Sequence, residues 1–138
     1  MTHTTHMEEF YIDGKWCKPG AGAQSIGVIN PATEEAFTQV ALGTTADAAR
    51  AIDAAHAAFE TFSQTTRAER IELLESIRDA YEARMDDFAS AMSDEMGAPL
   101  GYALSDQAGS GLGHLNATLE ALKSFAFETQ RGTTRIVH

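Results

Sequence analysis

The stretch that decides the fold is TTRAERIELLESIRDAYEARMDDFASAMSDEMGAPL, residues 65–100. Thr66 is followed three residues later by Glu69, and this spacing is typical of a capping box, in which two side chains satisfy backbone N–H groups at a helix start. Apolar residues then recur at helical spacing: Ile71, Leu74, Ile77, Tyr81, Met85, Phe88 and Met92. The pattern predicts a single helix of about 27 residues that ends near Glu95.

Two further helices are predicted on either side of this one. Before it, Thr44 and Asp47 indicate a helix start, because a cap and an acidic first turn both favour that end of a helix. After it, Gly97 suits a left-handed residue beyond the helix end, and Pro99 fits the first turn of a new helix. The new helix is predicted over residues 100–124.

Short strands are expected ahead of the helices. Asp13-Gly14 lies within FYIDGKW, residues 10–16, and this dipeptide is a strong signal for a two-residue hairpin turn. Strands are also expected at IGVIN, residues 26–30, and at AFTQVAL, residues 36–42. The composition of GTTRIVH at the C-terminal end changes toward that of a strand after Gly132.

Composition and charge exclude several classes of function. The 138 residues are 43% hydrophobic, which is ordinary for one globular domain. The net charge of −10 removes any broad attraction to nucleic acid or to anionic lipid. No apolar run approaches the roughly 20 residues of a membrane-spanning helix, and the N-terminus does not resemble a signal peptide. We therefore expect a cytoplasmic protein with no nucleic-acid partner and no membrane partner.

The histidines and the single cysteine do not form a metal or catalytic pattern. His3 and His6 could share a helix face and bind a metal, but a disordered tail over residues 1–9 is favoured because no third ligand follows. Cys17 has no partner for an intrachain disulfide and no nearby base, so a structural role is favoured over nucleophilic catalysis. His56 and His114 lie within helical patterns and have no nucleophile at an identifiable spacing.

The glycines at 109, 111 and 113 form GSGLG within the third predicted helix. A dinucleotide-binding loop needs a strand before its glycines and a helix start after them, and neither is predicted here. Glycine costs about 1 kcal/mol relative to alanine in a helix interior, so these positions require a packing reason. We expect the close approach of a neighbouring backbone.

Glu95 is the most informative acidic residue. Counting in sevens from Leu74 through Tyr81 and Phe88 leads to Glu95, which would continue the apolar face of the helix. A carboxylate that faces a core needs a basic partner, backbone N–H groups, a cation or a proton. The alternative is that the helix frays before Glu95 and that the side chain points to water.

Five segments in order resemble the N-terminal part of the aldehyde dehydrogenase superfamily. They are YIDGKW near the start, VINPATEE at 28–35, AIDAAHAAFETF at 51–62, RAERIELLESIRDAYEAR at 67–84 and DEMGAPL at 94–100. The similarity extends from about Phe10 to His138. It implies an α/β fold in which this chain supplies the first part of the cofactor-binding domain.

The resemblance also implies the organisation of the chain. Residues 10–124 would belong to the cofactor-binding domain, with strands over 10–42 and helices over 47–124. Residues 125–138 would begin an oligomerisation arm that pairs with another subunit of a homo-oligomer. Family members are several times longer, so the chain is expected to stop before the first Rossmann strand.

The implied activity is oxidation of an aldehyde to a carboxylic acid with NAD or NADP. Family members use a cysteine thiolate that forms a thiohemiacetal, and their catalytic and nicotinamide-binding residues lie downstream of this segment. No catalytic or cofactor-binding residue is therefore assigned here, and the chain alone is expected to be inactive. One site is implied, for a monovalent cation (potassium or sodium) held by the backbone carbonyls of Val28 and Ile29 and by Glu95.

A second hypothesis belongs to another class of function. The chain could be a stand-alone, non-catalytic helical module that binds a protein partner through surfaces that the rest of an enzyme would otherwise cover. An aldehyde substrate and NAD are implied under the first hypothesis only.

Overall fold

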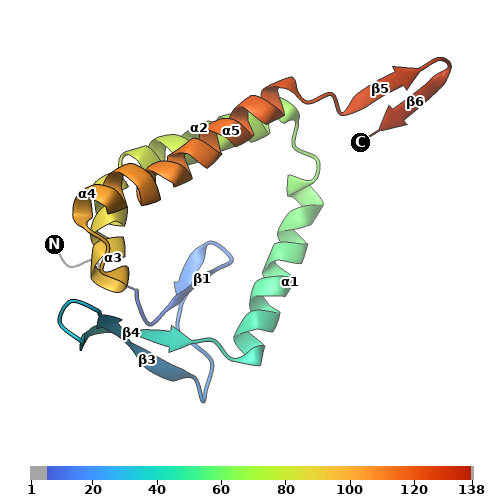
Figure 1. Cartoon of the computed structure of the whole chain (residues 1–138). Helices are drawn as coiled ribbons and strands as arrows, with labels where there is room; N and C mark the ends of the chain where they lie inside the picture. The colour runs from blue at the N-terminus through green and yellow to red at the C-terminus, as the bar shows by residue number, and fades with distance from the viewer. Residues whose placement is uncertain (1–5, 138) are drawn as a thin grey trace.

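The computed structural model describes residues 6–137 (Figure 1). Four strands come first: β1 Phe10–Ile12, β2 Lys15–Cys17, β3 Gln24–Asn30 and β4 Glu35–Leu42. The helical part follows: α1 Thr45–Phe62, α2 Arg67–Glu82, α3 Met85–Met96, α4 Leu100–Tyr102, the π-helix η1 Ala103–Ala108 and α5 Gly109–Ser124. Strands β5 Glu128–Arg131 and β6 Thr134–Val137 end the described residues. His3 and the first five positions of the predicted tail lie outside them.

The strands pair as three separate antiparallel hairpins within the described residues, β1–β2, β3–β4 and β5–β6. The predicted hairpin turn at Asp13-Gly14 is confirmed, because both residues have positive φ angles, 54° and 73°. The predicted strand after Gly132 is also confirmed as β6, but its partner β5 was not predicted. Gly132 itself has a φ of 59° in the turn between them.

The predicted helix starts are confirmed at both capping boxes. Thr44 accepts a hydrogen bond from the Asp47 N–H, and Thr66 accepts one from the Glu69 N–H, each at 3.2 Å. The carboxylates of Asp47 and Glu69 accept in return from the backbone of the capping threonine. Arg70 then joins α2 to the end of α1, because its guanidinium donates to the Ser63 carbonyl at 3.3 Å and lies over the Phe62 ring, 5.5 Å from the centroid.

The prediction of one helix from residue 67 to near Glu95 is wrong, because the chain turns at residues 83–84 between α2 and α3. Arg84 leaves helical geometry with φ −118° and ψ 18°. In an unbroken helix, Tyr81 and Phe88 would be about 10 Å apart along the axis. The turn instead stacks their rings, with centroids 4.4 Å apart. Two carboxylates, Asp86 and Asp87, occupy the first turn of α3, where the helix dipole favours them.

The third predicted helix is present over Leu100–Ser124 with a π-helical segment, η1, that the sequence did not predict. The hydroxyl of Tyr81 on α2 donates to the Ala108 carbonyl at the end of η1, at 3.0 Å. A Cβ on Gly111 would collide with the Tyr81 ring and hydroxyl. The expected close approach is therefore real at Gly111, but its cause is a side chain and not a backbone, and Gly113 faces open space.

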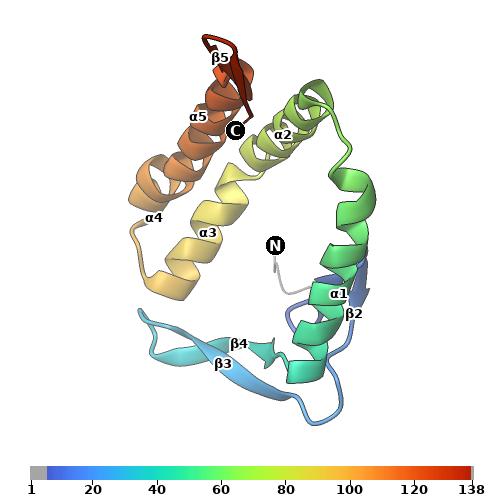
Figure 2. The same cartoon turned by 90° about the vertical axis from the view of Figure 1, so that its right-hand side faces the viewer.

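The described residues form an open arrangement of elements, here called the frame, and do not close around a large hydrophobic core. Helices α2 and α5 lie side by side, while α1 and the N-terminal hairpins stand apart across a gap (Figures 1 and 2). Between residues 6 and 137, four apolar residues are fully buried: Ala89, Ala103, Ala108 and Leu119. The chain exposes 10040 Å², whereas a compact monomer of this mass exposes about 7,000 Å². A large apolar surface is therefore uncovered.

Helix α1 carries much of that uncovered surface. The side chains of Ile52 and Phe59 are 68% and 65% exposed. None of the helices between residues 6 and 137 is both long and apolar enough to cross a membrane.

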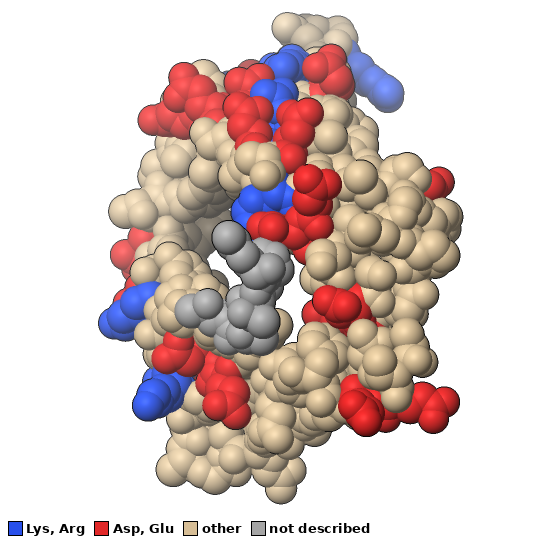
Figure 3. All heavy atoms as spheres, turned by 90° about the vertical axis from the view of Figure 1, so that its left-hand side faces the viewer, with Lys and Arg blue, Asp and Glu red and all other residues tan. Residues whose placement is uncertain are grey.

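Over the face drawn in Figure 3, acidic side chains are widely spread and basic ones do not merge into a continuous patch.

Candidate functional site

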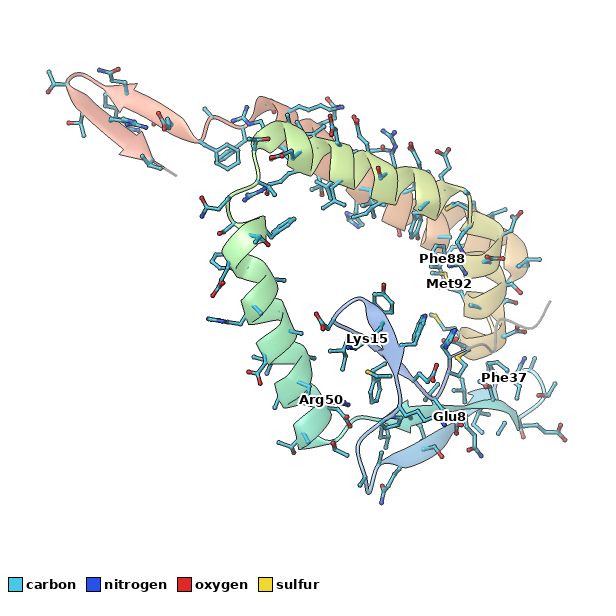
Figure 4. All side chains as sticks on the ribbon, turned by 180° about the vertical axis from the view of Figure 1, so that it is seen from behind. Glu8, Lys15, Phe37, Arg50, Phe88 and Met92 are labelled. Atoms are coloured by element: carbon cyan, nitrogen blue, oxygen red, sulfur yellow. The ribbon has the colours of Figure 1, made fainter. Side chains whose placement is uncertain are left out.

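Glu95 lies in the last turn of α3, and its side chain is exposed. The expectation that its carboxylate faces a core is wrong, because the side chain points to water. The turn at residues 83–84 separates α3 from Leu74 and Tyr81, but Glu95 still follows Phe88 by seven residues within α3 and lies on the same face of that helix. Phe88 and Met92 of that face lie on the side of α3 toward the N-terminal hairpins (Figure 4), whereas the last turn of the helix leaves Glu95 exposed.

Val28 and Ile29 lie near the end of β3, opposite an irregularity in β4. Val28 pairs with Thr38 and Ile29 pairs with Ala36, so Phe37 is an extra residue on β4. Such a bulge disrupts the ladder locally and removes backbone groups from regular pairing. The Val28 side chain is half-buried, and that of Ile29 is 51% exposed.

The end of α3 approaches the turn that follows these two residues. Gly97 ends the helix with a φ of 71°, as predicted, and a Cβ placed on it would lie 2.8 Å from Cγ of Pro31. The turn itself is held by Asn30, whose side-chain oxygen accepts from the Ala32 N–H at 2.9 Å. The structure therefore brings the C-terminus of α3 against the segment that contains Val28 and Ile29.

The electrostatics of this junction favour a cation over an anion. The last carbonyls of a helix lack partners within the helix, and the helix dipole places partial negative charge there. The Glu95 carboxylate adds a full negative charge at the same end. Among the described residues, no group of three or more His, Cys, Asp and Glu side chains could hold a metal, so any cation here would need backbone oxygens.

The other residues weighed from the sequence lie apart from this junction. The Cys17 thiol donates to the Phe10 carbonyl at 3.3 Å, within the β1–β2 hairpin. It lines a hollow of about 390 Å³ together with Lys15 and Arg50, both of which pair with carboxylates. His56 and His114 are exposed on α1 and α5. The ring of His6 stacks on Trp16, with centroids 4.2 Å apart.

Asp47 is more than the helix-start residue that the sequence indicated. Its carboxylate is buried and accepts from the Thr44 N–H at 2.8 Å, the Thr44 hydroxyl at 2.7 Å and the Gly20 N–H at 2.9 Å. Arg50 donates to it as well (Figure 4 labels Arg50). The Thr44 backbone, the Thr44 hydroxyl and Gly20 hold the pKa of the Asp47 carboxyl far below its ordinary value.

This arrangement makes Asp47 a structural anchor and not an acid–base group. Its oxygens already have donors, and a carboxyl with so low a pKa does not take up a proton near neutral pH. The capping spacing of Thr44 and Asp47 is visible in the sequence. The bond to Gly20, 27 residues earlier, has no local signal and depends on how the loop before β3 returns to α1.

Comparison with known proteins gives one consistent result. The pattern of the aldehyde dehydrogenase family matches residues 16–137. A 3-succinoylsemialdehyde-pyridine dehydrogenase of a Pseudomonas species is 45% identical over 130 residues, which cover 94% of this chain and 27% of that protein.

Solved structures agree with the sequence comparison. An aldehyde dehydrogenase from Bartonella henselae is 40% identical, with a TM-score of 0.87 over 91% of this chain and 27% of that one. A mutant aldehyde dehydrogenase from Pseudomonas syringae, in complex with NAD+ and octanal, is 38% identical, with a TM-score of 0.90 over 98% of this chain and 27% of that one. The present chain thus spans about a quarter of the length of the relatives that it matches.

Proposed function

Because this chain belongs to the aldehyde dehydrogenase family, we propose that it forms the N-terminal quarter of an enzyme that oxidises an aldehyde to a carboxylic acid with NAD or NADP. The observation that carries the proposal is the continuous family match over residues 16–137. The uncovered apolar surface of the frame supports it, because such a surface is the kind that the rest of a larger enzyme would bury.

The role of this chain in that enzyme is to support the fold and not to react. NAD or NADP would accept the hydride, but residues 109–113 cannot cradle a pyrophosphate, since they begin α5 directly after η1 and their N–H groups face the carbonyls of the preceding turn. Cys17 donates its thiol hydrogen to the backbone, and among residues 6–137 no base accepts a hydrogen bond from it. The chain's own residues instead order the hairpins against the helices.

The candidate site is a monovalent cation site for potassium or sodium. In this proposal the backbone carbonyls of Val28 and Ile29 and the carboxylate of Glu95 bind the ion. Three observations support it: the bulge beside Val28, the contact of Gly97 with Pro31, and the negative end of the α3 dipole. The cation would tie α3 to β3 and would take no part in hydride transfer.

The proposed assembly is a homo-oligomer in which residues 125–138 form the start of the arm. Hairpin β5–β6 projects away from the helices (Figure 1). Its two strands pair only with each other within the described residues, so each strand keeps an open edge to which a strand of a second subunit could add.

The alternative, a non-catalytic module that binds a protein partner, draws on the same exposed apolar side chains of α1. The experiment that separates the two is an assay of aldehyde-dependent NAD or NADP reduction by the product of the complete reading frame that encodes this chain. Reduction supports the enzyme. A folded product that binds neither the cofactor nor an aldehyde would support the module.

A further inference from the structure

A three-residue connector joins α5 to the β5–β6 hairpin. Helix α5 ends at Ser124, and Phe125 leaves helical geometry with ψ 127° while its N–H still donates to the Ala121 carbonyl at 2.8 Å. The hairpin begins at Glu128 and projects beyond the helices (Figures 1 and 4). The direction in which the hairpin projects therefore depends on Phe125, Ala126 and Phe127.

The hairpin is stiffened internally, and the helix before the connector is tied to its neighbour. Arg135 on β6 donates to the Glu128 carboxylate on β5, with Nε 2.9 Å from Oε2. On the other side of the connector, Lys123 pairs with Glu75 of α2 at 3.1 Å. The helix pair and the hairpin thus meet only through this short connector.

Arg67, the first residue of α2, contacts this connector through an N–H donor and through the face of its guanidinium. Its Nη2 donates to the Phe125 carbonyl at 2.5 Å. Its guanidinium also lies over the Phe127 ring, 4.9 Å from the centroid, and the rings of Phe125 and Phe127 meet edge to face at 4.9 Å. A planar guanidinium can donate in its plane and stack on a ring at the same time, which a lysine cannot do.

We propose that Arg67 is a positioning residue that sets the direction of the β5–β6 hairpin by holding the connector at Phe125 and Phe127. Its consequence for assembly rests on the proposed function: the open strand edges are presented to a second copy of the chain at a defined angle. The residue acts through the connector and touches neither substrate nor cofactor.

The position of the hairpin can be measured directly by double electron–electron resonance, which gives the distance between two spin labels, on the full 138-residue chain. Spin labels are placed at Glu72 on α2 and at Thr133 in the hairpin turn, in a Cys17→Ser background. Labelled chains are diluted with unlabelled ones, so that only distances within one chain contribute to the signal. The variants are Arg67→Ala, Arg67→Lys and Phe127→Leu. Arg78→Ala is the matched control, because Arg78 lies on the same helix and bonds its neighbour Asp79.

We expect a narrow distance distribution for the unmodified chain and for Arg78→Ala. Loss of a hydrogen bond to a charged donor should raise the fraction of chains whose connector has detached from α2 by about tenfold or more. Arg67→Ala should therefore give a broad distribution of distances between the two spin labels. Arg67→Lys and Phe127→Leu should broaden it as well, each by losing one of the two contacts. A narrow, unshifted distribution for Arg67→Ala would overturn the proposal.

Folding and assembly are followed separately. Circular dichroism reports whether each variant keeps its helices; if Arg67→Ala does not, narrow distributions in both Arg67→Lys and Phe127→Leu overturn the proposal instead. Sedimentation of the complete reading-frame product reports assembly. A broader hairpin distribution with unchanged assembly supports the role of Arg67 and contradicts the proposed pairing of the arm, whereas an unchanged distribution rejects the role of Arg67 whatever the assembly shows.

Discussion

Tyr81 and Gly111 fit together so closely that a Cβ on residue 111 would collide with the Tyr81 hydroxyl and force the ring to shift. The Tyr81 ring crosses from α2 to α5 at this point, and its hydroxyl donates to the Ala108 carbonyl. Because α2 and α5 lie side by side in the described chain, this contact aligns two of the main helices of the frame (Figure 2).

Gly111→Ala should therefore destabilise the chain. Overpacking of this kind costs about 1–3 kcal/mol, and the better helix propensity of alanine offsets about 1 kcal/mol of that. Gly113→Ala is the matched control, since its added methyl would meet open space and should be neutral or slightly stabilising. Urea unfolding of both variants measures the difference, and equal midpoints would show that the Tyr81 contact does not restrict position 111.

Asp47→Asn should reduce stability in a pH-dependent manner. The pKa of the native carboxyl is lowered below its ordinary value of 3.8, so the unfolded chain binds more protons than the native one in acid. The stabilisation is then fully present above that value and is lost as the pH falls through the lower native pKa. We expect the gap in urea midpoint between native and variant chains to be widest at neutral pH and to shrink toward pH 2.

Asp53→Asn provides the comparison, because Asp53 is an exposed carboxylate on the same helix. It should leave the urea midpoint at neutral pH nearly unchanged. If the gap for Asp47→Asn had the same width at every pH, the carboxylate charge would not be what links Thr44 and Gly20.

Glu95→Gln should weaken the dependence of stability on potassium or sodium in the product of the complete reading frame. The physical reason is the loss of the one charged ligand of the proposed site. Melting temperatures would be compared in potassium chloride, sodium chloride and choline chloride at equal ionic strength. Asp94→Asn, an adjacent exposed carboxylate, is the control. If the parent protein melted at the same temperature in all three salts, the proposed cation site would be contradicted.

The isolated chain should bind an apolar dye and self-associate, because side chains such as Ile52 are exposed. Ile52→Ser should lower dye binding without lowering the melting temperature. Leu119→Ala removes a buried side chain instead and should cost about 2–5 kcal/mol. A dye-excluding monomer in sedimentation velocity would contradict the uncovered surface described for this chain.

Local signals predicted most of the secondary structure. The hairpin at Asp13-Gly14, the caps at Thr44 and Thr66 and the left-handed Gly97 each depend on residues within a few positions, and all four are present. These features require only backbone conformation and neighbouring donors and acceptors, which a sequence shows directly.

The failures of prediction come from one local turn that carries no clear signal and from contacts between distant segments. The turn at residues 83–84 stacks Tyr81 on Phe88, and no glycine or proline marks it; only the acidic pair at the start of α3 hints at a new helix. Both the tight fit at Gly111 and the bond from Gly20 to Asp47 join residues about 30 positions apart. The error at Glu95 concerns burial and not helical phase: Glu95 keeps the face of Phe88 within α3, but the last turn of the helix is exposed among the described residues.

The most direct test of the account is an exchange of segments. The present chain would replace the equivalent quarter of the related Pseudomonas dehydrogenase, and aldehyde-dependent NADH formation would be measured for the chimera, for its parent and for the 138-residue chain alone. We predict that the chimera turns over its aldehyde at a rate of the same order as the parent, and that the chain alone forms no NADH. Aldehyde-dependent NADH formation by the chain alone, or an assembled chimera that binds NAD but has lost turnover, would contradict a supporting role for this segment.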